Sequence, residues 1–142
     1  MGRKKWFRAY VERLLMEQFG VRELLVDGDG DVPFHRGSSA CWVSVETRGP
    51  LAVRVWAVAA GGLRPTAAVL REVNDLNGCA GLAKVVLEHG RVVVELRLPA
   101  DQVTRRSLER ACGHVLGLAD DVGGLFTVHG GSTPFPAPLQ AG

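Results

Sequence analysis

The spacing of apolar residues changes repeatedly along this 142-residue chain, and this feature restricts the fold most strongly. Apolar residues recur at helical spacing near the N-terminus, alternate with polar residues over about residues 32–58, and then return to helical spacing before a second alternating stretch. A period near 3.6 describes one face of a helix, whereas a period of two describes a half-buried strand. The chain is therefore predicted to combine helices and strands in a definite order.

The helical stretches predict three helices. The first covers about residues 5–19 and ends before Gly20. The second begins near Pro65, which suits a first helical turn, and ends at Asn77-Gly78. The third follows Thr104, a residue type that caps helix N-termini. The predicted core-facing residues of the first and third helices are Phe7, Val11, Leu14, Leu15, Leu108, Ala111, Cys112, Val115, Leu116 and Ala119.

The alternating stretches predict five strands, at about residues 32–36, 41–46, 53–58, 83–87 and 92–98. Short connections join the first three, and His89-Gly90 reads as a tight hairpin turn between the last two. The order α-βββ-α-ββ-α predicts an α+β fold with one mostly antiparallel five-stranded sheet and helices packed on it. We expect this single domain to cover residues 1–128, with a flexible Gly- and Pro-rich tail at residues 129–142.

The charge balance argues against nucleic acid and membranes as partners. There are 17 Lys and Arg residues against 15 Asp and Glu residues, which gives no strong electrostatic attraction to DNA or anionic lipid. Residues 3–8 mix basic and aromatic side chains, but a solvated first helical turn explains them as well. No apolar run reaches the length of a membrane helix, and charged residues replace the apolar core of a secretory signal. We expect a cytoplasmic protein.

The three cysteines, Cys41, Cys79 and Cys112, are odd in number and widely spaced. They form neither a disulfide framework nor a CxxC motif, so we predict free thiols packed as small hydrophobic side chains.

No motif in the sequence predicts catalysis or metal binding. The acidic run at residues 27–31 resembles the start of a calcium loop, but Val32 and Ser38 stand where that loop needs Gly and Glu. The four histidines have no metal-ligand spacing, and no GxSxG nucleophile motif occurs. We interpret the acidic run as a turn and expect no metal, no cofactor and no enzymatic activity.

Two tryptophans occupy unusual positions on the predicted strands. Trp42 shares its strand face with Ser44 and Glu46, and Trp56 shares its face with Arg54. Both rings are thus predicted to be neighbours on the sheet face away from the third helix. An open sheet face with large aromatic side chains is a candidate partner surface. The alternative is that the tail, the first helix or a second subunit covers the rings.

Several stretches together resemble a known family. They are Asp29-Gly30-Asp31-Val32-Pro33-Phe34, Cys41-Trp42-Val43-Ser44-Val45, Leu70-Arg71-Glu72-Val73-Asn74-Asp75-Leu76-Asn77, Ala83-Lys84-Val85 and Leu98-Pro99-Ala100. Over about residues 5–128 the chain resembles the YbjN-like proteins, in particular the actinobacterial members grouped with type III secretion chaperones as peptide-binding chaperone domains (TY-Chap type).

This resemblance implies a non-enzymatic α+β module that binds peptide segments or protein partners, often as a homodimer. It supplies no catalytic residues, and YbjN-like proteins have also been described as sensory transduction regulators. We predict that Trp42, Trp56, Arg54 and Phe34 contact the partner. The alternative function is a small-ligand-binding or enzymatic domain with a pocket between sheet and helices, which convergent polar groups in such a pocket would favour.

Overall fold

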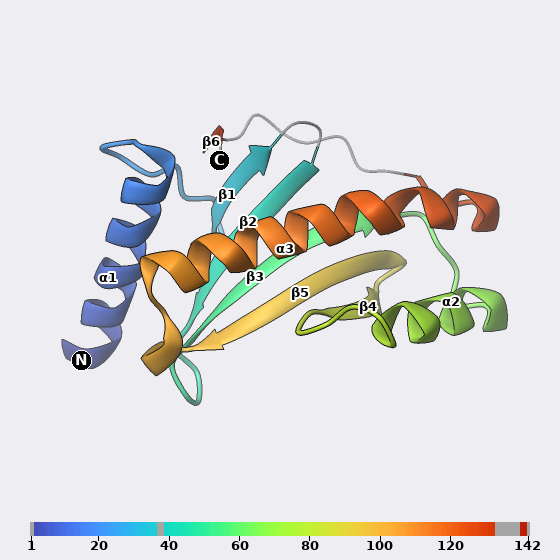
Figure 1. The fold of residues 1–142 in the computed structure, drawn as a ribbon, viewed down its shortest axis with the longest axis horizontal. Coiled ribbons are helices and arrows are strands. Elements are labelled where there is room, and N and C mark those ends of the chain that lie inside the picture. Colours follow the sequence, from blue (N-terminus) through green and yellow to red (C-terminus); the bar gives the residue numbers. More distant parts are fainter. Residues whose placement is uncertain (1, 37–38, 133–139, 142) are drawn as a thin grey trace.

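The computed structural model describes residues 2–36, 39–132 and 140–141. Its elements follow the predicted order (Figure 1). The helices are α1 (Gly2–Phe19), α2 (Ala67–Asn77) and α3 (Arg105–Gly123), with short 3-10 helices at η1 (Ala100–Gln102) and η2 (Gly124–His129). The strands are β1 (Val32–Arg36), β2 (Ser39–Glu46), β3 (Ala52–Ala60), β4 (Lys84–Glu88), β5 (Arg91–Pro99) and β6 (Gln140–Ala141).

The strands form one sheet with the order β4-β5-β3-β2-β1-β6. All pairings among β1 to β5 are antiparallel, which confirms the predicted fold class. The prediction missed β6, which pairs in parallel with β1, because two residues carry no detectable period. β6 lies within the predicted tail, as does Ser132, which exchanges backbone hydrogen bonds with Gly61. Residues 133–139 and 142 of that tail lie outside the described residues.

One face of the sheet is covered by helix. α3 packs across β2, β3 and β5, and α1 packs against α3 (Figure 1). The predicted core faces of both helices are confirmed, since the side chains named for them are buried. The largest fully buried side chains are Phe7, Phe34 and Phe126. Burying an aromatic side chain of this size stabilises a fold by about 1.5–3 kcal/mol, so this layer is the main source of stability.

Helix starts are set by capping residues. Thr66, not Pro65, caps α2: its side chain accepts a hydrogen bond from the Val69 backbone N–H at 3.2 Å. The predicted start was therefore early, because Pro65 precedes the cap. Thr104 caps α3 as predicted and forms a reciprocal capping box with Ser107.

The thiols differ in environment. Cys41 and Cys112 are fully buried, and burial raises the pKa of Cys41 well above its usual value and that of Cys112 to about 12. Both are therefore neutral, hydrophobic side chains at physiological pH. Cys79 is free but exposed in the turn after α2, so the prediction of a packed thiol is wrong there. All three cysteines are unpaired.

The β4–β5 turn allows a test of local geometry. His89 and Gly90 both have positive φ angles, of 51° and 77°, as a two-residue hairpin turn of this type requires. A Cβ atom at Gly90 would lie 2.9 Å from the Leu63 carbonyl oxygen, whereas Gly49, with φ of 73°, has open space around it. We expect Gly49→Ala to cost about 1–2 kcal/mol of unfolding free energy from backbone strain alone. Gly90→Ala should cost more.

Urea unfolding of both variants measures this difference. Equal losses for Gly49→Ala and Gly90→Ala would contradict the close approach of the turn to Leu63.

Candidate functional site

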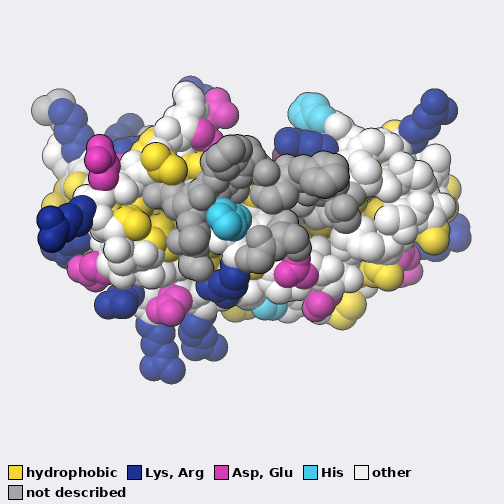
Figure 2. Space-filling model, turned by 90° about the horizontal axis from the view of Figure 1, so that it is seen from above, with side chains coloured by type: hydrophobic (Ala, Val, Ile, Leu, Met, Phe, Trp, Pro, Cys, Tyr) yellow, Lys and Arg dark blue, Asp and Glu magenta, His cyan; other side chains and the backbone are white. Residues whose placement is uncertain are grey.

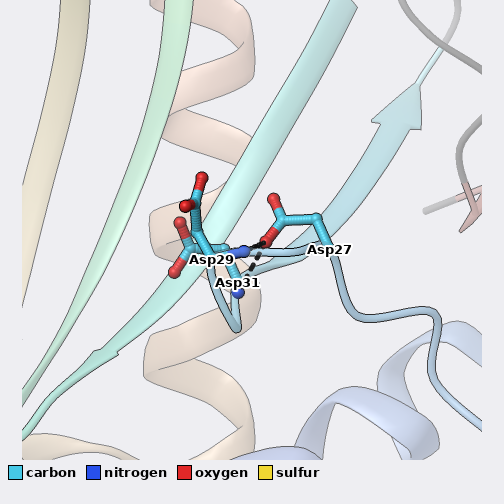
Figure 3. Close-up of side chains that lie close together, drawn as sticks. All are labelled: Asp27, Asp29 and Asp31. Atoms are coloured by element: carbon cyan, nitrogen blue, oxygen red, sulfur yellow. Dashed lines mark hydrogen bonds between the residues drawn. The ribbon is translucent and has the colours of Figure 1, made fainter.

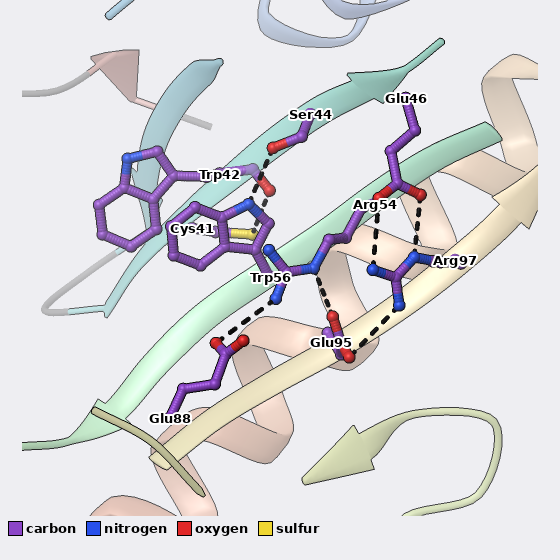
Figure 4. Close-up of polar contacts among 9 residues, drawn as sticks. All are labelled: Cys41, Trp42, Ser44, Glu46, Arg54, Trp56, Glu88, Glu95 and Arg97. Carbon is purple, nitrogen blue, oxygen red and sulfur yellow. Dashed lines mark hydrogen bonds and ion pairs between the residues drawn. The ribbon is translucent and has the colours of Figure 1, made fainter. Parts of the chain in front are cut away.

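The two tryptophans lie together on the helix-free face of the sheet (Figure 4). Trp42 on β2 stands directly opposite Trp56 on β3, and their rings stack with centroids 4.6 Å apart and planes 17° from parallel. Alternation along the strands explains this placement, because Val43 and Val55 beside them point into the core. The predicted neighbourhood of the two rings is confirmed.

Polar contacts fix the orientation of Trp56. Its indole Nε1–H donates to the Ser44 Oγ at 2.9 Å, and the Ser44 hydroxyl in turn bonds the Asp31 carboxylate. The Arg54 guanidinium lies over the same ring, 5.0 Å from its centroid. Such a cation–π contact adds about 0.5–1 kcal/mol at an exposed site. These contacts therefore hold the stacked pair in one geometry.

An ion network runs beside the tryptophans (Figure 4). Glu95 on β5 is only 7% exposed, and it forms ion pairs with both Arg54 and Arg97. Arg97 also donates to Glu46 at 2.8 and 3.3 Å, and this hydrogen bonding raises the pKa of Arg97. Glu88 lies 3.9 Å from Arg54. The arginines are thus neutralised within the face.

The helix-free face has an apolar part and a charged part. Register places Trp56 between Trp42 and Glu95, and places Val93 between Val58 and Val86. Val93 is fully buried although it lies on this face. The sequence predicted Trp42, Trp56 and Arg54 as contact residues of this face. It did not predict that Glu95 and the row of Val58, Val93 and Val86 lie beside them, because the pairing of β3 with β5 cannot be read from local patterns. The available signal in the sequence was that Arg91, Glu95 and Arg97 alternate with apolar residues along β5, which puts Glu95 on the polar side of that strand.

Phe34 is not part of this face. It is fully buried on the helix-covered side, where its ring packs 5.0 Å from that of Phe19. The structure thus brings together three of the four predicted contact residues and separates Phe34 from them. The physical reason is that side chains alternate between the two faces of a strand. Pro33 is the cross-strand neighbour of Trp42, so the next residue, Phe34, points to the opposite face.

The acidic run forms a turn, as its sequence predicted (Figure 3). The Asp27 carboxylate accepts the backbone N–H groups of Asp29 and Asp31, each at 2.9 Å. Carboxylate oxygens of all three aspartates lie within 4.8 Å of one another. The Arg8 guanidinium donates to the Gly30 carbonyl at 3.3 Å and ties the turn to α1. These hydrogen bonds explain why residues 27–31 form a turn.

A groove lies on the other side of the sheet, between α3 and the loop at residues 78–83. Its volume is about 510 Å³. Its apolar lining consists of Leu82, Leu96, Leu98 and Ala111, and Ser107, Arg110, Gly113 and His114 of α3 complete it. The His114 Nε2 contacts the Ala80 carbonyl oxygen at 3.0 Å. The groove is therefore largely apolar, with the polar side chains of Ser107, Arg110 and His114 along α3.

Comparison with known families now identifies the fold and its class of activity. Residues 5–137 match the family described as T3SS (YopN, CesT) and YbjN peptide-binding chaperone 1, TY-Chap1. The chain belongs to this family. The match confirms the resemblance found in the sequence and extends beyond residue 128, into the predicted tail. The description of this family is that of peptide-binding chaperones, so the chain belongs to a group of protein-binding modules.

Solved structures of two complexes share the fold. The ExsC–ExsE complex contains a chain with 16% identity and a TM-score of 0.66, and the similarity covers 82% of this chain and 93% of that one. The HopA1–SchA chaperone–effector complex contains one with 11% identity and a TM-score of 0.66, covering 85% and 95%. A comparison with curated proteins finds no match. Among the described residues, no helix has the length and apolarity needed to cross a membrane.

Glu95 offers a test of the ion network. Glu95→Gln removes the charge shared by Arg54 and Arg97 at a buried position, and we expect it to lower the unfolding free energy by about 1–3 kcal/mol. Glu46→Gln is the matched control, because Glu46 is more exposed and should cost at most about 1 kcal/mol. Chemical unfolding near neutral pH measures both. A loss at Glu46 as large as that at Glu95 would contradict a central role for the buried carboxylate.

Asp31 predicts a pH dependence of stability. Burial raises the pKa of its carboxyl, and the charges of Asp27 and Asp29 raise it further, against hydrogen bonding by Ser44 and the charge of Arg54. A pKa raised in the folded state gives stability that is complete below the unfolded value of about 3.9 and is lost as pH rises through the folded pKa. Asp31→Asn stays neutral throughout. Its unfolding free energy relative to the unsubstituted chain should therefore increase as pH rises from acid to neutral.

Unfolding titrations at acid and neutral pH measure this change. Asp29→Asn, at an exposed position of the same turn, is the control and should show a smaller increase. An equal pH dependence for both variants would mean that the turn responds only to its total charge.

Proposed function

We propose that the helix-free face centred on Trp42 and Trp56 is the surface with which this chain binds a segment of a partner protein. The stacked pair carries the proposal: two large rings lie side by side, outside the core, in a fixed orientation. Aromatic residues of this kind are common anchors of interfaces, and rings that are already ordered lose little further entropy on binding.

The neighbouring charges support a protein segment over nucleic acid as the partner. Arg54 and Arg97 are paired with Glu46, Glu88 and Glu95, so these two arginines beside the tryptophans are already neutralised and attract phosphates weakly. On the surface seen in Figure 2, basic and acidic side chains are likewise interspersed. In this proposal the chain works by binding alone, as a chaperone or adaptor, without catalysis.

The proposal places the chain in the cytoplasm. Its support is the set of three unpaired cysteines, of which Cys79 is exposed. A reducing compartment maintains such thiols, whereas an oxidising one favours their pairing.

Substitution of the tryptophans tests the surface. After the native partner has been isolated with the full chain and identified by mass spectrometry, the contacted segment is titrated calorimetrically. We expect Trp42→Ala or Trp56→Ala to weaken binding by about 1–4 kcal/mol. Each substitution should lower the unfolding free energy by less than the roughly 3–5 kcal/mol that is lost when a core aromatic residue is replaced by alanine. Trp6→Ala is the matched control, because Trp6 is 66% exposed on α1.

Fluorescence gives an independent measurement. The chain has three tryptophans, so a Trp6→Phe variant leaves only Trp42 and Trp56 as indole emitters. Addition of the partner segment should then shift their emission. Loss of folding in the alanine variants, with unchanged binding per folded molecule and no emission shift, would show that the rings serve packing alone.

A further inference from the structure

The end of the molecule where α1 meets the start of α3 concentrates positive charge. Residues 2–13 and 100–110, which together we call the basic end, hold eight Lys and Arg side chains against three Asp and Glu. Their net charge is +5, whereas that of the whole chain is +2, so the remainder of the chain is net negative. We propose that the basic end docks a second protein through an acidic surface of that protein, by side-chain contacts alone. This contact is separate from the face that carries Trp42 and Trp56.

Contacts between α1 and the α3 region bring the charges of the basic end together. The Tyr10 hydroxyl donates to the Val103 carbonyl at 2.9 Å, directly before the residue that caps α3. α1 also packs against α3 (Figure 1). In Figure 2, Lys and Arg side chains gather toward the left, the end at which α1 lies, with acidic side chains among them. Two segments that are far apart in the sequence thus form one basic surface.

Both helices of the basic end begin with charges of the unfavourable sign. The N-terminus is the positive end of the helix dipole, so Asp and Glu stabilise it and Lys and Arg do not. Neither α1 nor α3 has an acidic residue in its first turn. α1 instead begins with Arg3, Lys4 and Lys5, and α3 begins with Arg105 and Arg106. Departures from the rules of local stability are expected where a surface serves function, and here they add to the positive potential.

The cations of the basic end have no ionic partner within the described part of the fold. The ion pairs of the described residues all join β2, β3, β4 and β5, so none involves α1 or α3. Lys4, Arg105 and Arg106 are exposed. Carboxylates of a docking protein can therefore pair with them without first breaking an ion pair. Complementary charge of this kind steers association and suppresses wrong partners.

An aromatic side chain offers an anchor within the basic end. Trp6 is 66% exposed, and its ring stacks on that of Tyr10 with centroids 5.4 Å apart and planes 3° from parallel. The Arg13 guanidinium lies over the Tyr10 ring, 5.8 Å from its centroid. Exposed tryptophan is a common interface anchor. The acidic surface that fits the basic end therefore includes an apolar side chain that covers Trp6.

The size and composition of the basic end favour a protein over RNA or an anionic membrane. Residues 3–13 of α1 span about 15 Å, which suits a compact contact rather than a track along many phosphates. Glu12, Asp101 and Glu109 interrupt the cations, and the net negative remainder of the chain repels a long polyanion. The apolar face of α1 is buried in the core, so it is not available for insertion into a bilayer.

Differential peptide selection on the full chain tests this proposal. A random twelve-residue phage library is depleted on the double variant Arg105→Glu/Arg106→Glu and then selected on the unsubstituted chain. We expect the enriched peptides to carry several Asp or Glu residues. The best enriched peptide is then synthesised and titrated. It should bind the double variant about ten-fold more weakly or worse, and Trp6→Ala about five-fold more weakly.

Two controls separate local charge from net charge and from misfolding. Arg64→Glu/Arg71→Glu makes the same change in net charge at exposed positions in and beside α2, at the opposite end of the molecule (Figure 1). Its binding of the peptide should stay within about two-fold, because distant charges are screened. Arg105→Glu/Arg106→Glu should raise the Tm by about 1–4 °C, since acidic residues suit the first turn of α3. Lost binding in a more stable variant excludes unfolding as its cause.

Several outcomes would overturn the inference. They are enrichment of peptides without acidic residues, equal binding by the two double variants, and a lower Tm for Arg105→Glu/Arg106→Glu. A twelve-nucleotide uridine oligomer and phosphatidylglycerol vesicles are tested in parallel. Tighter binding of either than of the acidic peptide, lost in Arg105→Glu/Arg106→Glu, would assign the surface to RNA or to a membrane instead. A change only in self-association, measured by analytical ultracentrifugation, would make it a contact between copies.

The two proposals fail in distinguishable ways. Trp42→Ala should leave binding of the acidic peptide unchanged, and Arg105→Glu/Arg106→Glu should leave the segment at the tryptophan face bound. If the acidic peptide binds both double variants equally while Trp42→Ala weakens binding of that segment, the proposed function stands and the basic end is excluded. If the acidic peptide depends on Arg105 and Arg106 while the tryptophan variants bind normally, the basic end stands and the proposed function fails.

Discussion

The packing of α3 across one face of the sheet is the interaction on which the rest of the structure depends. Its buried stripe covers β2, β3 and β5, three strands that are not all consecutive in the chain. α1 then packs against α3 and completes the layer (Figure 1). Because a two-layer fold buries one face of its sheet, the opposite face must be stabilised by its own side chains.

The helix-free face meets this requirement through lateral contacts. Trp42 and Trp56 cover one another, Arg54 covers the outer ring surface of Trp56, and Glu95 joins the two arginines. Such contacts leave the face ordered but accessible, which is the state in which a binding surface loses least entropy when a partner arrives. The same contacts that stabilise the face therefore prepare it for recognition.

The unequal lengths of β4 and β5 give the helix-covered side its own accessible surface. Five residues of β4 cannot cover nine residues of β5, and α3 borders the uncovered end. The tryptophan face is accessible because helices cover only the other face of the sheet. The groove beside α3 is accessible because the edge strand β4 is shorter than β5.

The sequence by itself determined the three main helices, the five antiparallel strands and the face on which most of their residues lie. Local spacing carries this information, so it predicted the buried stripes of α1 and α3 and the shared face of Trp42 and Trp56. It also identified the family, since element order and short motifs are properties of the linear chain. Phe34 was predicted to contact the partner together with Trp42 and Trp56, but alternation along β1 directs its side chain to the core instead.

The tertiary structure decided which elements are neighbours. The pairing of β3 with β5 brings Glu95 beside Arg54, two residues 41 positions apart, and no local pattern encodes that contact. The addition of β6 to β1 and the groove beside α3 arise in the same way. Strand order depends on the summed burial and hydrogen bonding of the whole chain, and such non-local energies are fixed only when the sheet has formed.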